Sequence, residues 1–234
     1  MILSHKHRFI FLCNGRTGTT SIERSLADLD EGRDYVFDAK HLFVAKHIPP
    51  AILRGCVPAR VWDDYFKFVF VRNPYDWLVS QWQHNFKLRR IPRDARVKVD
   101  WAELTPDRKL LVMGRPVEKL AATEVFSCDD IEFLYRFLKQ NFKALPYAPA
   151  SLQSSYVFDA DGQKMVDFVG RYERLAEDYA TILERLGLQR ALPHLNITKR
   201  GPFRGYFTPE SAALVTRLWA TDFETLGYST CLDE

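Results

Sequence analysis

The chain has 234 residues, of which 47% are hydrophobic and 27% are charged, so it has the size and composition of one globular domain and is short for two. The net charge of +3 is too small to argue for binding to nucleic acid or to a membrane surface. No apolar run approaches the ~20 residues that a membrane-spanning helix needs, and the four cysteines show neither metal-binding nor disulfide spacing.

The first predicted strand, Phe9 to Cys13, leads into an anion-binding turn. It is an unbroken apolar run, which is typical of a strand buried on both faces of a parallel sheet. Glycines at 15 and 18 then allow a tight turn into a helix predicted from Thr19 to Leu29, whose first amides and positive dipole end attract an anion. The side chains that add charge or hydroxyl donors here are Arg16, Thr17, Thr19, Thr20 and Ser21.

This turn is a phosphate cradle, but it is not a Walker A loop. A Walker A loop has a glycine five residues before the position of Gly18 and a lysine directly after it. Cys13 and Thr19 stand in those two places. Binding of ATP or GTP with magnesium is therefore disfavoured.

A second strand-to-helix junction runs from Phe66 to Ser80. Its apolar strand, Phe68 to Val71, ends in Arg72, and Ser80 lies about two turns along the helix that follows. Arg72 and Ser80 can both reach one anion, the arginine through a charged fork and the serine through its hydroxyl. The alternative for Arg72 alone is a plain surface charge.

The two motifs together resemble a known family. The loop GRTGTT and the segment VRNPYDWLVS are similar to those of sulfotransferases that use 3′-phosphoadenosine 5′-phosphosulfate, especially the branch that acts on carbohydrates. The resemblance implies an α/β fold with one sulfotransferase domain over residues 1–234, built on a central parallel β-sheet flanked by helices with a P-loop-like nucleotide site. It continues at VGRYE, residues 169–173, and at LPHLNITKRGPFRG, residues 192–205, whereas residues 89–160 match no motif.

The resemblance also implies roles for the cofactor-binding residues. Arg72 and Ser80 would hold the 3′-phosphate, and a late basic loop would close over it, with a solvated turn as the alternative for that loop. Arg16 stays protonated and cannot act as an acid, so its expected catalytic role is that of an electrostatic clamp. The first loop would hold the 5′-phosphosulfate through Arg16, Thr17, Gly18, Thr19, Thr20 and Ser21, and the late loop comprises Lys199, Arg200 and Gly201.

Transfer of a sulfuryl group to a hydroxyl needs a base, and histidine suits that task near neutral pH. His47 is favoured because it follows the apolar stretch Leu42 to Ala45 and would lie at a strand tip, where ligands gather in open α/β sheets. Relatives in the resembling family often place a Lys–His pair between the two anion motifs, where Lys46 and His47 stand. The alternatives are His41 or Glu173 as the base, or packing roles alone.

These features predict a sulfotransferase that moves a sulfuryl group from 3′-phosphoadenosine 5′-phosphosulfate to an acceptor hydroxyl, on a carbohydrate or a glycolipid, without a metal. Adenosine 3′,5′-bisphosphate would be the other product. The alternatives are a kinase-like, nucleotide-dependent phosphoryl transferase and a non-catalytic module that binds adenosine bisphosphate. We expect a cytoplasmic location, because the Golgi members of the family carry a membrane anchor before the catalytic domain and none precedes the first strand here.

Two further segments have plain structural interpretations. Lys87 to Lys98 carries six basic residues and one acidic residue, which indicates a solvated loop or, alternatively, a lid over an anionic acceptor. Asp130 to Phe142 has the apolar spacing of an amphipathic helix that packs on a core.

Overall fold

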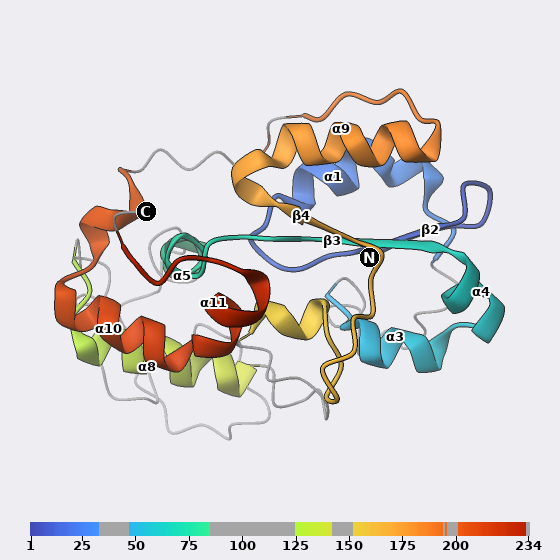
Figure 1. The fold of residues 1–234 in the computed structure, drawn as a ribbon. Helices are drawn as coiled ribbons and strands as arrows, with labels where there is room; N and C mark the ends of the chain where they lie inside the picture. Colours follow the sequence, from blue (N-terminus) through green and yellow to red (C-terminus); the bar gives the residue numbers. More distant parts are fainter. Residues whose placement is uncertain (33–46, 85–124, 142–151, 194, 196–200, 233–234) are drawn as a thin grey trace, which may run out of the picture. The chain divides into compact units, whose positions relative to one another are not determined.

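The computed structural model describes residues 1–32, 47–84, 125–141, 152–193, 195 and 201–232 (Figure 1). The chain divides into two compact units. The first comprises Met1–Asn73 and Tyr147–Lys199, and the second comprises Pro74–Pro146 and Arg200–Glu234. Within the described residues, the first unit holds the β-sheet and the second is mainly helical.

The sheet of the first unit has four strands in the order β1-β2-β3-β4. Strands β2, β3 and β4 are parallel, with Phe11 opposite Phe68 and Phe68 opposite Phe168. This confirms the predicted α/β fold with a mostly parallel sheet. Strand β1 adds an antiparallel edge that the sequence analysis did not include. The strands are β1 (Ile2–Ser4), β2 (Phe9–Leu12), β3 (Phe66–Val71) and β4 (Phe168–Arg171).

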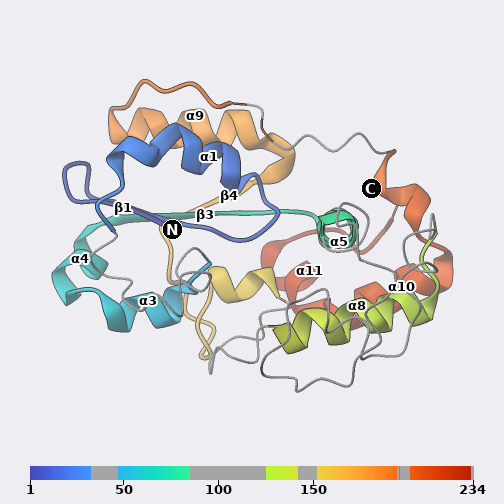
Figure 2. The ribbon, with the colours of Figure 1, turned by 180° about the vertical axis from the view of Figure 1, so that it is seen from behind.

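Helices cover both faces of this sheet (Figures 1 and 2). Helices α1 (Thr19–Leu26) and α9 (Leu175–Leu186) lie side by side on one face, and α3 (Pro50–Cys56) lies on the opposite side. Helix α4 (Ala59–Asp64) leads into β3, and a single 3₁₀ turn, η1 (Ala27–Leu29), completes the helix that was predicted to reach Leu29. The sheet is therefore enclosed, as its continuous apolar strands require.

Alternate residues of β2 and β3 supply the two sides of the core. Phe9, Phe11, Phe68 and Phe70 form one cluster with buried residues of α1 and α9, among them Ile22, Leu26, Tyr179 and Ile182. Ile10, Leu12, Val69 and Val71 are equally buried, with exposed fractions of 0–1%, and side chains alternate in direction along a strand. Burial on both faces explains why these strands contain no polar alternation.

The second unit is built from α5 (Pro74–Trp82), α8 (Cys128–Asn141), α10 (Pro209–Leu218) and α11 (Ala220–Leu226). Tyr75 packs in an aromatic cluster with Phe203, Phe207 and Phe223, and its hydroxyl contacts Thr216 at 2.8 Å.

Thr208 caps the N-terminus of α10 with a capping box that includes Ser211. Helix α8 confirms the amphipathic helix predicted near residues 130–142, since Ile131, Phe133, Leu134 and Leu138 are buried.

Some predictions concern residues outside the part of the chain that the structure describes. These include the basic segment Lys87 to Lys98 and the strand predicted at Leu42 to Ala45. Among the helices that the structure does describe, none is both long and apolar enough to cross a membrane.

Candidate active site

The first anion loop connects β2 to α1 and contains two residues with a positive φ, Arg16 and Gly18. Gly18 caps α1 with a φ of 83°, in the left-handed region that glycine adopts readily. Arg16 has a φ of 69°, which is uncommon for a residue with a side chain. Thr17 is fully buried, and its hydroxyl donates to the Asn14 carbonyl at 2.7 Å. The Thr17 side chain thus closes the loop, and only its backbone amide could serve an anion.

The N-terminus of α1 supplies the donors expected for an anion. Thr19 and Thr20 open the helix, where amides have no carbonyl partner within the helix, and its first turn contains no acidic residue. Thr20 is exposed and Thr19 is buried. Ser21 is also buried, and its hydroxyl accepts a hydrogen bond from the Leu195 amide at 3.2 Å. A hydroxyl that accepts one hydrogen bond still carries its own proton, so the Thr19 and Thr20 amides and the Ser21 hydroxyl all stay donor candidates.

Packing fixes the loop from the side of α9. A Cβ atom at position 18 would lie 2.7 Å from Cδ2 of Leu175, so any larger residue would have to displace this leucine side chain. Asn14 ties the start of the loop to the neighbouring strand, because its side-chain amide donates to the Phe70 carbonyl at 3.0 Å. Contacts within the protein thus hold the loop at both ends.

Arg72 follows β3 directly and lies beside this loop. Only 5% of its surface is exposed. Its guanidinium stacks 3.9 Å above the ring of Tyr172, and Nη1 donates to the Arg16 carbonyl at 3.0 Å. The two arginines singled out in the sequence, Arg16 and Arg72, thus belong to one connected site.

Gln153 is a residue of this site that the sequence analysis missed. It lies in a 3₁₀ turn, η5 (Gln153–Tyr156), inside the stretch that matched no motif. Its Oε1 accepts from the Arg72 amide at 2.9 Å, and its Nε2 donates to the Arg72 carbonyl at 2.7 Å. The Asn14 side chain also donates to Oε1, at 3.3 Å. One buried amide therefore joins the ends of β2 and β3.

His47 lies at the end of β2, next to the loop. Its Nδ1 is 2.7 Å from the Cys13 carbonyl oxygen. A carbonyl can only accept, so Nδ1 carries the proton, and in the neutral ring the lone pair is on Nε2. The ring is also in contact distance of Gly15, since a Cβ built there would be 3.7 Å from Cε1. This tautomer is the one that a general base acting through Nε2 requires.

Two residues that contact His47, Cys13 and Tyr156, have side chains whose pKa values are raised. Burial raises the pKa of the Cys13 thiol from 9.0 to about 12. Burial likewise raises the pKa of Tyr156, whose hydroxyl donates to the His47 carbonyl at 2.6 Å. Both residues therefore stay protonated near neutral pH, and Tyr156 remains a hydrogen-bond donor.

Glu173, the alternative base, is exposed and accepts a hydrogen bond from the Asn73 amide through Oε1 at 2.6 Å. This contact gives Glu173 a role in joining the ends of β3 and β4. The other alternative, His41, lies outside the described residues, as does Lys46.

The remaining predicted cofactor residues belong to the second unit or are not described. Ser80 is buried in α5, and Gly201 is exposed. Lys199 and Arg200 lie outside the described residues. Among the residues that are described, no three histidine, cysteine, aspartate or glutamate side chains are grouped so as to hold a metal ion.

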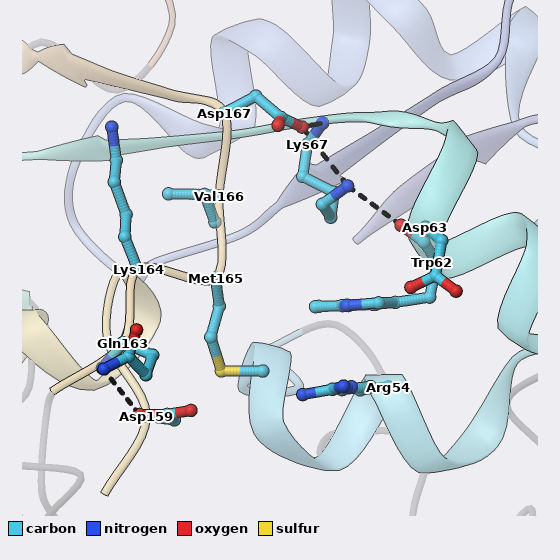
Figure 3. Close-up of a pocket in the computed structure, with 10 residues that line it drawn as sticks. All are labelled: Arg54, Trp62, Asp63, Lys67, Asp159, Gln163, Lys164, Met165, Val166 and Asp167. Atoms are coloured by element: carbon cyan, nitrogen blue, oxygen red, sulfur yellow. Dashed lines mark hydrogen bonds and ion pairs between the residues drawn. The ribbon is translucent and has the colours of Figure 1, made fainter. Parts of the chain in front are cut away.

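A cavity of about 250 Å³ lies at the other end of β3 (Figure 3). Lys67, at the start of the strand, is buried there and donates to the carbonyls of Trp62 and Tyr65 at 2.8 and 2.7 Å. It also forms an ion pair with Asp167 at 3.2 Å. These contacts give Lys67 a structural role, because its side chain joins the end of α4 to the start of β3.

The fold and the loop geometry define a class of protein. A parallel sheet whose strand tip opens into a glycine-capped helix, beside an arginine from the next strand, is typical of α/β proteins that bind phosphorylated nucleotides. A model of the sulfotransferase family matches residues 1–229, and the chain belongs to this family of transferases dependent on 3′-phosphoadenosine 5′-phosphosulfate. Neither a comparison with curated proteins nor one with solved structures gives a significant match.

Proposed function

We propose that this sulfotransferase moves the sulfuryl group from 3′-phosphoadenosine 5′-phosphosulfate to a hydroxyl of a carbohydrate or a glycolipid. The observation that carries the proposal is the convergence, at one end of the sheet, of three elements: the Gly18-capped helix, the buried Arg72 and the oriented His47. Family membership supports the donor. The carbohydrate acceptor is supported by the likeness of the two anion motifs to the carbohydrate-type branch.

The donor set of the site fits a phosphosulfate. The amides of Thr19 and Thr20 and the charge of Arg16 would hold the 5′-phosphosulfate and stabilise negative charge on its bridging oxygen. All of these are donors or cations, as an anionic group requires. Thr17, Gly18 and Ser21 would complete the cradle through the loop backbone and the first turn of α1.

Arg72 would hold the 3′-phosphate. Its guanidinium has a fixed direction, because Tyr172 stacks on one face and the Arg16 carbonyl accepts from Nη1. Arginine presents several donors in one plane, a geometry that matches the oxygens of a phosphate. Ser80, Lys199, Arg200 and Gly201 remain predicted partners of the same phosphate.

His47 would accept the proton of the acceptor hydroxyl at Nε2. The bound donor supplies an activated sulfuryl group, whose bond to the phosphate oxygen breaks as the acceptor oxygen attacks sulfur. The leaving phosphate would take the electron pair of that bond, and the Arg16 guanidinium would neutralise the added charge. The proton moves from the acceptor oxygen to His47, whose Nδ1 stays bound to the Cys13 carbonyl.

Titration calorimetry tests the donor assignment. With EDTA present, the protein should bind adenosine 3′,5′-bisphosphate more tightly than AMP, and magnesium ATP in a separate sample should bind weakly. Preference for magnesium ATP would support the kinase-like alternative, which membership of the sulfotransferase family already disfavours.

The acceptor is tested separately, with the radiolabelled sulfate donor and a panel of galactose, N-acetylglucosamine, a galactolipid and a simple phenol. Label should pass to a sugar or to the glycolipid. Transfer to the phenol alone would contradict the carbohydrate part of the proposal.

A further inference from the structure

We propose that the 3₁₀ turn η5 is a positioning element that holds both Arg72 and His47, through Gln153 at its first residue and Tyr156 at its last. The inference rests on the proposed function, because it takes Arg72 as the 3′-phosphate ligand and His47 as the base. It assigns a role in the reaction to a stretch of the chain without a sequence motif.

Gln153 acts on Arg72 through the backbone. Strand pairing of β3 ends at Val71, one residue before Arg72. The Gln153 side chain then binds both the amide and the carbonyl of Arg72, as a neighbouring strand would, at 2.9 and 2.7 Å. Gln153 is 1% exposed, so water does not replace these bonds if they are lost. The direction in which the Arg72 side chain leaves the sheet therefore depends on this amide.

Tyr156 acts on His47 from the other end of the same turn. Its hydroxyl donates to the His47 carbonyl at 2.6 Å, while the ring Nδ1 of His47 is bound to the Cys13 carbonyl at 2.7 Å. Tyr156 thus anchors the backbone of His47, and the Cys13 carbonyl anchors its ring. Loss of the Tyr156 hydroxyl would release the backbone, and the distance between the ring and the Cys13 carbonyl would then no longer be fixed.

Ser155 provides a matched control within the same turn. Its hydroxyl donates to the Leu152 carbonyl at 2.8 Å, a local bond that involves neither Arg72 nor His47. Ser155→Ala therefore removes a hydrogen bond of η5 without touching either contact. If η5 mattered only for stability, variants at 153, 155 and 156 would differ only in their unfolding.

The first experiment measures nucleotide binding by calorimetry. Gln153→Met keeps the length of the side chain and removes its hydrogen bonds, and we expect it to weaken binding of adenosine 3′,5′-bisphosphate by about tenfold or more. AMP binding should fall less, and Ser155→Ala should leave both within about twofold of wild type. A partly unfolded variant would lower the binding stoichiometry for both nucleotides and leave the ratio of the two Kd values unchanged. An unchanged ratio in Gln153→Met would overturn the role of Gln153.

The second experiment follows the His47 ring directly. Long-range ¹H–¹⁵N spectra report which ring nitrogen of a histidine carries the proton, and His47→Gln identifies the signals. In wild type and Ser155→Ala, His47 should be protonated at Nδ1. In Tyr156→Phe, the ring should be held less firmly against the Cys13 carbonyl and should exchange between its two tautomers. The shifts of the two ring nitrogens should therefore move towards each other. Identical spectra for wild type and Tyr156→Phe would overturn the role of Tyr156.

The two proposals fail differently. If wild type shows no preference for adenosine 3′,5′-bisphosphate over AMP, the proposed function fails and the Arg72 half of the inference fails with it, while the spectra still judge the His47 half. If wild type shows that preference and both η5 variants behave like Ser155→Ala, the proposed function stands and the inference is wrong.

Discussion

Leu175, the first residue of α9, packs directly over Gly18, the residue that caps α1. A Cβ at position 18 would come within 2.7 Å of Cδ2 of Leu175, and the backbone φ of 83° is itself unfavourable for a residue with a side chain. Glycine is thus favoured at this position for two separate reasons. The loop assigned to the phosphosulfate is shaped by packing against α9 as well as by its own sequence.

Gly18→Ala should destabilise the fold more than the same change at Gly162. Gly162 shares a positive φ of 75°, but a Cβ there meets no neighbouring atom within 4 Å. The left-handed conformation costs about 1–2 kcal/mol for alanine at either position, and displacing the Leu175 side chain from its rotamer should add about 0.5–1.5 kcal/mol at position 18. Urea unfolding measures both values. The extra cost should shrink in a Leu175→Ala background, and equal costs at the two glycines would show that the contact with Leu175 is unimportant.

Arg72→Ala should weaken binding of adenosine 3′,5′-bisphosphate by about 10- to 100-fold, because a hydrogen bond to a charged group contributes about 1.5–3 kcal/mol. AMP lacks the 3′-phosphate, so its binding should hardly change. Ser80→Ala should act in the same direction with a smaller loss. Arg8→Ala removes the same charge from an exposed pair with Asp64 and serves as the control in the same titrations. Equal losses for the two nucleotides would remove Arg72 from the 3′-phosphate site.

His47→Gln should lower turnover by about 100-fold or more, the range in which a general base contributes, with little change in nucleotide affinity. The measurement is the transfer of labelled sulfate to the best acceptor of the panel, with calorimetry on the same preparation. His5→Gln is the control, because His5 contacts Tyr65 near the start of β3. If His47→Gln kept wild-type turnover, another residue would be the base. Glu173→Gln would then be the next variant to measure.

Because the pKa of Cys13 is raised, the free energy of unfolding should fall as the pH rises through the alkaline range. The unfolded thiol has a pKa of 9.0 and the folded thiol a pKa of about 12, so the folded state retains a proton that the unfolded chain releases. Stability from this group is complete below pH 9 and is lost as the pH rises towards 12, by at most about 1.4 kcal/mol per pH unit. Urea unfolding at several pH values in this window should show a shallower decline for Cys13→Ala than for wild type. Parallel declines would mean that other groups cause the loss.

The core of the fold could be predicted from the sequence because its strands are continuous apolar runs. Phe9–Leu12 and Phe66–Val71 lie within or around the predicted strands, and both are buried on two faces. The edge strand Ile2–Ser4 could not be predicted, because three residues carry too little periodicity to indicate a strand. Its pairing with β2 depends on the tertiary contact and not on a local pattern.

Candidate site residues could be predicted only where a local sequence pattern marks them. The anion loop, Arg72 and His47 were predicted because each follows an apolar segment, and their roles stay predictions. Gln153 lies 81 residues from Arg72 and 139 from Asn14, and Tyr156 lies 109 residues from His47. A glutamine and a tyrosine in an irregular stretch have no spacing that reveals such partners, and only the folded chain brings them together.

The left-handed backbone of Arg16 sets stability against function at a single residue. A glycine there would relieve about 1–2 kcal/mol of conformational cost, but it would remove the cation from the proposed phosphosulfate site. Stability alone would favour the glycine, and the proposed contact with an anion is a function that offsets the cost of the arginine. Stabilised versions of this enzyme should therefore be sought at positions away from this loop.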